Sequence, residues 1–106
     1  MNDTPIDRNG YAPSIIQFDM GQCYRCHKRA EKLDRHEIFG AANRVKSKRL
    51  GLWVMLCHTT CHEGRDGVHQ NSAEALKLHK IGQEAAMRRY GWSTEEFIGK
   101  FGKNYL

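Results

Sequence analysis

Four cysteines in two close pairs have the spacing that most directly suggests chemistry in this 106-residue chain. Two residues separate Cys23 from Cys26, three separate Cys57 from Cys61, and thirty lie between the pairs. One tight turn can present both sulfurs of a pair to the same ion, and zinc prefers a closed tetrahedron of such soft ligands. The spacing therefore predicts a structural Zn²⁺ site.

An even number of cysteines in a small protein is also compatible with disulfide bonds, and the redox compartment decides between the two interpretations. The first twenty residues carry Asp3, Asp7, Arg8 and Asp19 among few apolar positions, and the chain has no apolar run of eighteen residues. Neither a secretory signal nor a membrane-spanning helix is therefore expected. We expect a cytoplasmic protein with a metal site, and free or disulfide-bonded thiols are the alternative.

Histidine is the second residue type that stands out, because the chain contains six and several lie near the cysteines. His62 follows Cys61 directly, His69 lies seven residues later, and His36 belongs to the segment between the cysteine pairs. If the cysteine site holds these segments together, the three imidazoles can share a catalytic cation and leave positions open for water and a phosphate oxygen. The alternative is that they are hydrogen-bonded histidines of a zinc-finger fold.

The other histidines are expected to have ordinary roles. His58 lies between the cysteines of the second pair, where we expect exposure to solvent, with a contact behind a metal ligand or to a phosphate as the alternative. His27 follows the first pair and His79 lies in the apolar-periodic C-terminal half, so we expect surface or packing positions for both.

Positive charge is the third feature. Seventeen Lys and Arg against twelve Asp and Glu give a net charge of +5, and much of the excess lies between residues 25 and 49. Arg44, Lys46, Lys48 and Arg49 stand within six positions. Clustered positive charge attracts polyanions, so these residues are expected to contact DNA phosphates, with a solvated surface as the alternative.

Two strands must position the histidines. Residues 1–20 contain two prolines and no periodicity, so we expect an N-terminal arm docked by Ile15, Ile16 and Phe18. Residues 33–39 and 52–56 are predicted as antiparallel strands joined by a basic loop, with Cys57 at the end of the second strand. Cys61 is then expected at the start of a short helix or helical turn.

Helices are predicted over residues 71–90 and 94–101. Asn71 and Ser93 are suitable N-caps, each with a glutamate three residues later, and Gly91 is a suitable stop. The expected core-facing residues of the two helices are Leu76, Leu78, Ile81, Ala85, Met87, Phe97, Ile98 and Phe101. A cysteine knuckle, two strands and a helix that supplies the last thiolates describe one small α+β domain of the treble-clef type over residues 21–106.

The residues around His36 resemble a known family. The string LDRHEIFG at 33–40, with Leu56-Cys57 and Cys61-His62, is similar to the HNH endonucleases, which have a ββα-metal core. The strings GVH at 67–69, KIGQEA at 80–85 and FGKNYL at 101–106 are similar to small phage and prophage HNH proteins of the recombination-enhancement, RecA-dependent nuclease type. The resemblance covers residues 21–106. It implies a metal-dependent endonuclease that hydrolyses DNA phosphodiester bonds with low sequence specificity in a bacterial host cell, with a recombinase filament as a further partner.

The resemblance also implies roles for single residues. His36 and His62 match metal ligands, and His69 matches a further histidine that some members add. Glu37 takes the place of the family's general-base histidine; in an alternative alignment, His36 is the base. The implied catalytic ion is Mg²⁺, Mn²⁺, Zn²⁺ or Ni²⁺, of which nitrogen ligands suit the last three better.

Two positions depart from or extend the family pattern. Leu52 stands where the family has the asparagine that braces the link between the strands, and Asn43 is the alternative for that role. Arg65 is expected to clamp a phosphate. Because of the departures at Glu37 and Leu52, a non-catalytic treble-clef zinc-finger module that binds DNA or a protein partner is the alternative function.

Overall fold

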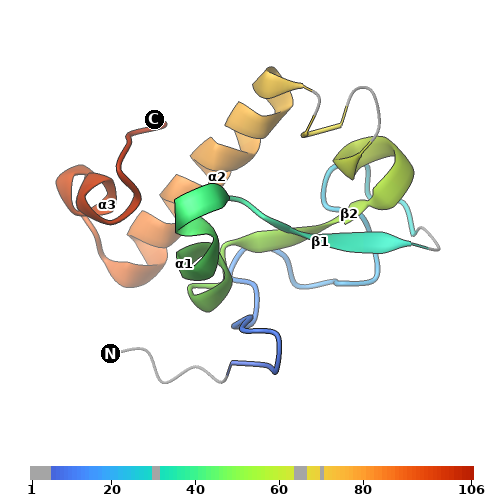
Figure 1. The fold of residues 1–106 in the computed structure, drawn as a ribbon, viewed down its shortest axis with the longest axis horizontal. Coiled ribbons are helices and arrows are strands. Elements are labelled where there is room, and N and C mark those ends of the chain that lie inside the picture. The colour runs from blue at the N-terminus through green and yellow to red at the C-terminus, as the bar shows by residue number, and fades with distance from the viewer. Residues whose placement is uncertain (1–5, 30–31, 64–66, 70) are drawn as a thin grey trace.

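The computed structural model describes residues 6–29, 32–63, 67–69 and 71–106, which form a two-stranded antiparallel sheet with helices (Figure 1). The expected α+β class is therefore confirmed. Among the residues described, no helix combines the length and hydrophobicity that a membrane-spanning segment requires. The elements in chain order are β1 (Leu33–Glu37), the 3₁₀ turn η1 (Ala41–Asn43), α1 (Arg44–Arg49), β2 (Trp53–Cys57), the π-helical turn η2 (His58–His62), α2 (Ser72–Tyr90) and α3 (Thr94–Phe101).

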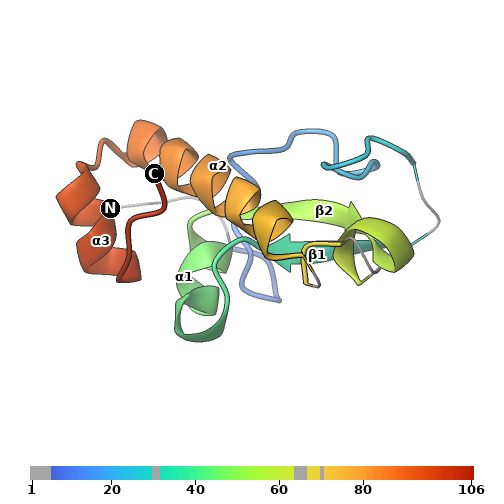
Figure 2. The same cartoon turned by 90° about the horizontal axis from the view of Figure 1, so that it is seen from above.

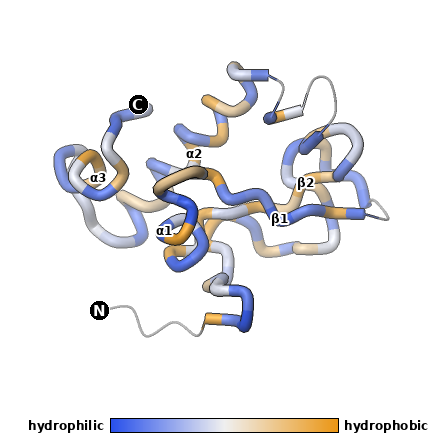
Figure 3. Tube along the Cα trace, viewed as in Figure 1, coloured by the Kyte–Doolittle hydropathy of each residue, from blue (hydrophilic) through white to orange (hydrophobic). Residues whose placement is uncertain are grey.

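The two strands differ in polarity. β2 is apolar and mostly buried, whereas β1 is hydrophilic after its first residue (Figure 3). They pair with His36 opposite Val54. Because side chains alternate across a strand, Asp34 and His36 project to one face of the sheet and Arg35 and Glu37 to the other. β1 therefore offers polar groups on both sides of its free edge.

The N-terminal segment runs along the other edge of β2. The side chain of Gln17 is buried, and its Oε1 accepts a hydrogen bond from the amide of Met55 at 2.8 Å. The amide of Ile15 donates to the carbonyl of Gly51 at 3.0 Å, and Ile15 and Ile16 pack against the core. Residues 15–17 of the expected N-terminal arm therefore pack against β2 and the core.

Three apolar residues that were expected to pack are exposed: Phe18 by 92%, Leu76 by 42% and Ile98 by 37%. Phe18 points outward because the preceding Gln17 takes the buried position. In α3, Phe97 and Phe101 fill the interface with the core, so Ile98 falls on the outer face.

Residues 44–49, which link the strands, form the helix α1. The prediction of a basic loop is therefore wrong for this segment. Buried Ser47 ties α1 to both strands: its Oγ accepts from the amide of Phe39 at 3.2 Å and donates to the carbonyl of Leu52 at 2.5 Å. Asn43 instead donates to the carbonyl of Phe101 at 2.9 Å. Ser47 thus stabilises the link between the strands, and Asn43 stabilises the end of α3.

Helix α2 lies obliquely to the strands (Figure 2) and begins and ends where the caps predict. Asn71 Oδ1 accepts from the amides at the start of the helix, and Gly91 ends it in the left-handed conformation with φ of 70°. Gly82 is buried where α2 meets the end of β1. A Cβ at Gly82 would lie 2.8 Å from Ile38 Cγ2 and 3.0 Å from Phe39 Cε2, so only glycine permits this approach.

Candidate functional site

The four cysteines converge where the N-terminal knuckle meets the end of β2. Their Sγ atoms lie within 4.8 Å of one another, and none forms a disulfide. The amide of Cys26 donates to Cys23 Sγ and the amide of Cys61 to Cys57 Sγ, both at 3.4 Å. Four sulfurs at this separation, supported by backbone donors, can hold one metal ion.

The pKa values of these thiols show how much negative charge the cluster can carry without an ion. Burial raises the pKa of Cys23, but backbone hydrogen bonds outweigh it and bring that pKa down to about 7. Burial and the hydrogen bonds of the other cysteines raise the pKa of Cys61 well above its usual value. Four thiolates cannot be buried together without a cation, so full ionisation of the cluster requires a metal.

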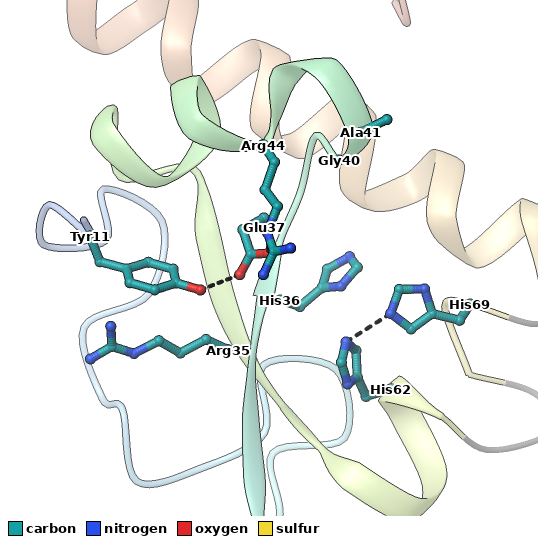
Figure 4. Close-up of a pocket in the computed structure, with 9 residues that line it drawn as sticks. All are labelled: Tyr11, Arg35, His36, Glu37, Gly40, Ala41, Arg44, His62 and His69. Atoms are coloured by element: carbon teal, nitrogen blue, oxygen red, sulfur yellow. Dashed lines mark hydrogen bonds and ion pairs between the residues drawn. The ribbon is translucent and has the colours of Figure 1, made fainter. Parts of the chain in front are cut away.

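Three histidines form a second cluster (Figure 4). His36 comes from β1, His62 from η2 and His69 from the segment before α2, and one ring nitrogen of each lies within 4.8 Å of the others. The Nε2 atoms of His62 and His69 are 2.9 Å apart. The ring centroid of His36 lies 5.2 Å from that of His62 and 5.3 Å from that of His69. These imidazoles can hold one metal ion.

A close return of the chain onto η2 brings His69 to this cluster. The amide of His69 donates to the carbonyl of His62 at 3.4 Å. Gly67 is required for the approach, because a Cβ there would lie 2.8 Å from the carbonyl oxygen of Thr60. Arg65, the expected phosphate clamp, lies outside the described residues.

Asp34 lies behind the cluster. Its Oδ2 is 2.8 Å from His62 Nδ1 and 2.5 Å from His58 Nδ1. Burial raises the pKa of Asp34, but the hydrogen bonds and charges of His58 and His62 outweigh it, and the pKa lies below its usual value. His58 is therefore a half-buried partner of Asp34, whereas a solvent-exposed position was expected for it.

His36 is suited to bind a metal as a neutral imidazole. Burial lowers its pKa to about 3, and the charges of His62, His69 and His79 act in the same direction. At neutral pH the ring therefore has a free lone pair. Both roles predicted for His36, metal ligand and general base, use this lone pair.

Glu37 lines the same pocket, of about 390 Å³, as the three histidines (Figure 4). Its Oε1 lies 2.9 Å from Arg44 Nε, and its Oε2 accepts a hydrogen bond from the hydroxyl of Tyr11. Burial and the neighbouring Glu37 raise the pKa of Tyr11 to about 12, so the hydroxyl remains a donor. Among the described residues that line this pocket, Glu37 is the one carboxylate.

The predicted phosphate-binding residues divide between two sides of α1. Arg44 lines the pocket, and Lys48 Nζ lies 4.6 Å from the ring centroid of Tyr11 on the same side. Lys46 donates instead to the carbonyl of Lys100 in α3, and Arg49 is exposed. The basic stretch of the sequence is therefore not one surface.

Sequence reasoning missed two residues of the pocket wall, Arg35 and Tyr11. The Arg35 guanidinium lies 4.4 Å from the ring centroid of Tyr11 and 4.9 Å from that of Trp53. The position of Arg35 next to His36 was a usable signal. Tyr11 lies in an aperiodic segment that gave no sign of its partners, because its contacts are far away in the sequence.

The fold and the clusters define a small α+β protein whose described residues include three groups of side chains that could each hold a metal ion: the four cysteines, the three histidines, and Asp34 with His58 and His62. Comparison of the chain with protein-family models, with curated proteins and with solved structures gave no match.

Proposed function

We propose that the protein is a metal-dependent endonuclease of the HNH type, with a treble-clef, ββα-metal arrangement, that hydrolyses phosphodiester bonds of DNA. One observation carries the proposal. His36, His62 and His69 converge on a pocket that is also lined by Arg44 and Glu37. Metal ligands, a cation for phosphate and a carboxylate to accept a proton are the groups that this hydrolysis requires.

The cysteine cluster would hold a structural Zn²⁺. Thiolate ligands in a closed set of four favour zinc, and such a site leaves no open position for a substrate. Because this cluster contains Cys61, the ion would also hold the neighbouring His62 in place. The sequence resemblance to small phage and prophage proteins supports a phage-encoded enzyme acting in the cytoplasm of a bacterial host, with a recombinase filament as a further partner.

A divalent ion on the three histidines would supply Lewis acidity to a phosphate oxygen of the substrate. All three ligands are nitrogen donors, which suit Zn²⁺, Mn²⁺ or Ni²⁺ better than Mg²⁺. Three histidine ligands would leave coordination positions for water and substrate, whereas the four cysteines would fill the coordination sphere of their ion.

The other pocket residues would bind the substrate and move a proton. Arg44 pairs with Glu37 through Nε, and because its side chain is 62% exposed it would reach a phosphate of the DNA. Glu37 would accept the proton of the attacking water, with the hydroxyl of Tyr11 orienting its carboxylate. Lys48 would contact a backbone phosphate further along, which gives affinity without sequence choice.

The test is cleavage of supercoiled plasmid by the full chain with each candidate ion, with and without a recombinase filament. We expect His62→Ala to abolish cleavage while the zinc content and the circular dichroism spectrum stay unchanged. His27→Asn is the matched control, since His27 is exposed and asparagine tolerates its positive φ of 65°. DNA binding without cleavage by the wild-type protein under all of these conditions would refute the nuclease and leave a zinc-finger binding module.

A further inference from the structure

One carboxylate oxygen ties both ends of the turn η2 to the strand β1. Asp34 Oδ2 contacts His58 Nδ1 at 2.5 Å and His62 Nδ1 at 2.8 Å, and these histidines are the first and last residues of η2. Asp34 stands two residues before His36 on the same face of β1. A single strand therefore supplies both a residue of the histidine cluster and the group behind another.

The contact selects one tautomer of His62. An ionised carboxylate accepts hydrogen bonds only, so His62 must carry its proton on Nδ1. The lone pair is then on Nε2, which faces the Nε2 of His69 at 2.9 Å. Without Asp34 the neutral ring could carry its proton on either nitrogen, and a proton on Nε2 would prevent that atom from binding an ion.

A second acceptor is near His62 but is placed less well. Glu63 Oε2 lies 3.3 Å from His62 Nδ1 and 3.8 Å from His69 Nε2. Its side chain is 47% exposed, whereas that of Asp34 is 21% exposed. A shorter contact from a less exposed carboxylate is the stronger hydrogen bond, so Asp34 controls the ring.

His58 fixes the carboxylate itself. Its contact with Asp34 Oδ2 is the shorter of the two, and it comes from the opposite end of the same turn. With two imidazoles on one oxygen, the carboxylate cannot rotate away without losing both contacts. His58 thus holds Asp34 from the other end of η2.

We propose that Asp34 is a positioning residue that holds His62 in its Nδ1–H tautomer, so that Nε2 is presented to a divalent ion, with His58 as the second anchor of the carboxylate. The role of the ion rests on the proposed function, whereas the tautomer does not. A carboxylate behind a histidine ligand orients the ring and raises its basicity, and its loss typically lowers metal affinity by about 10- to 100-fold.

The first test is ¹⁵N NMR of the histidine rings in full-length protein loaded with Zn²⁺ on the cysteines and free of other ions. We expect the His62 ring to be protonated on Nδ1 in the wild type, and this signature to be lost in Asp34→Ala. Asp19→Ala is the control, because Asp19 is an exposed carboxylate paired with Arg29. An unchanged Nδ1–H signal in a folded Asp34→Ala protein would overturn the proposal.

The second test is calorimetric titration of the same zinc-loaded proteins with Co²⁺. We expect Asp34→Ala to weaken binding at the histidine cluster by about tenfold or more, and Asp34→Asn, which keeps the shape and one acceptor oxygen, to weaken it less. Equal affinity in the wild type and both variants would contradict the positioning role. If the wild-type protein failed to cut DNA, the proposed function would fall, while the NMR and Co²⁺ results would still decide the role of Asp34.

Discussion

At the scale of single residues, the position of Glu37 decides how the pocket would work. Its Oε2 accepts a hydrogen bond from the hydroxyl of Tyr11, its Oε1 forms an ion pair with Arg44, and its side chain is 12% exposed. A carboxylate held in this way keeps a fixed orientation toward the pocket. It does not belong to the histidine cluster, so its chemical role can be separated from metal binding.

Glu37→Gln should therefore reduce catalysis without reducing ion binding. We expect kcat for DNA cleavage to fall by about 10²- to 10⁴-fold, the range of general-base catalysis, with KM and Co²⁺ affinity close to those of the wild type. Glutamine keeps the size of the side chain and can still accept from Tyr11. The measurement is single-turnover cleavage, with Glu84→Gln on the exposed side of α2 as the control. A cleavage rate equal to that of the wild type would exclude Glu37 as the base.

At the scale of elements, the contact between α2 and the end of β1 holds the histidine-bearing strand against the core. Gly82 allows this contact, because Ile38 and Phe39 lie where a side chain would be. A glycine inside a helix normally costs about 1 kcal/mol relative to alanine. Here the close approach of the two elements outweighs that preference.

Gly82→Ala should consequently destabilise the fold by about 1–3 kcal/mol, since an extra methyl group in a packed core forces its neighbours to move. Gly99→Ala is the matched control: Gly99 lies in α3 with nothing within 4 Å of its would-be Cβ, so alanine should stabilise by up to about 1 kcal/mol. Urea unfolding of both zinc-loaded variants measures the difference. A stabilising Gly82→Ala substitution would show that the helix can move away from the strand.

At the scale of the whole molecule, the cysteine cluster connects parts of the chain that are distant in the sequence. It links the N-terminal knuckle to the end of β2 and to η2, which carries His62. The apolar core of a chain of 106 residues is small, so a structural ion would contribute a large part of the folding free energy.

Removal of Zn²⁺ by a strong chelator should therefore abolish cooperative thermal unfolding, and the addition of Zn²⁺ should restore it. The measurement is circular dichroism during heating, together with the zinc content of each sample. Cys26→Ser, at the least buried of the four positions, should behave like the chelated protein. An unchanged melting temperature after complete removal of zinc would show that the core folds without the ion.

The amino-acid sequence by itself determined the features that depend on neighbouring residues. The cysteine pairs, the N-caps at Asn71 and Ser93, the stop at Gly91 and the apolar β2 are all patterns within a few positions of the chain. Such patterns act through local hydrogen bonds and side-chain alternation, and they are therefore readable without a fold.

Only the tertiary structure decided which distant side chains meet. Asp34 lies 28 positions from His62, and Tyr11 lies 26 positions from Glu37, yet both pairs are hydrogen-bonded. The same holds for the outward position of Phe18, which depends on where Gln17 is buried. These contacts arise from the packing of several elements at once, and no spacing along the chain encodes them. The pairs of cysteines were visible in the sequence, whereas the groups that surround the histidines became visible only in the fold.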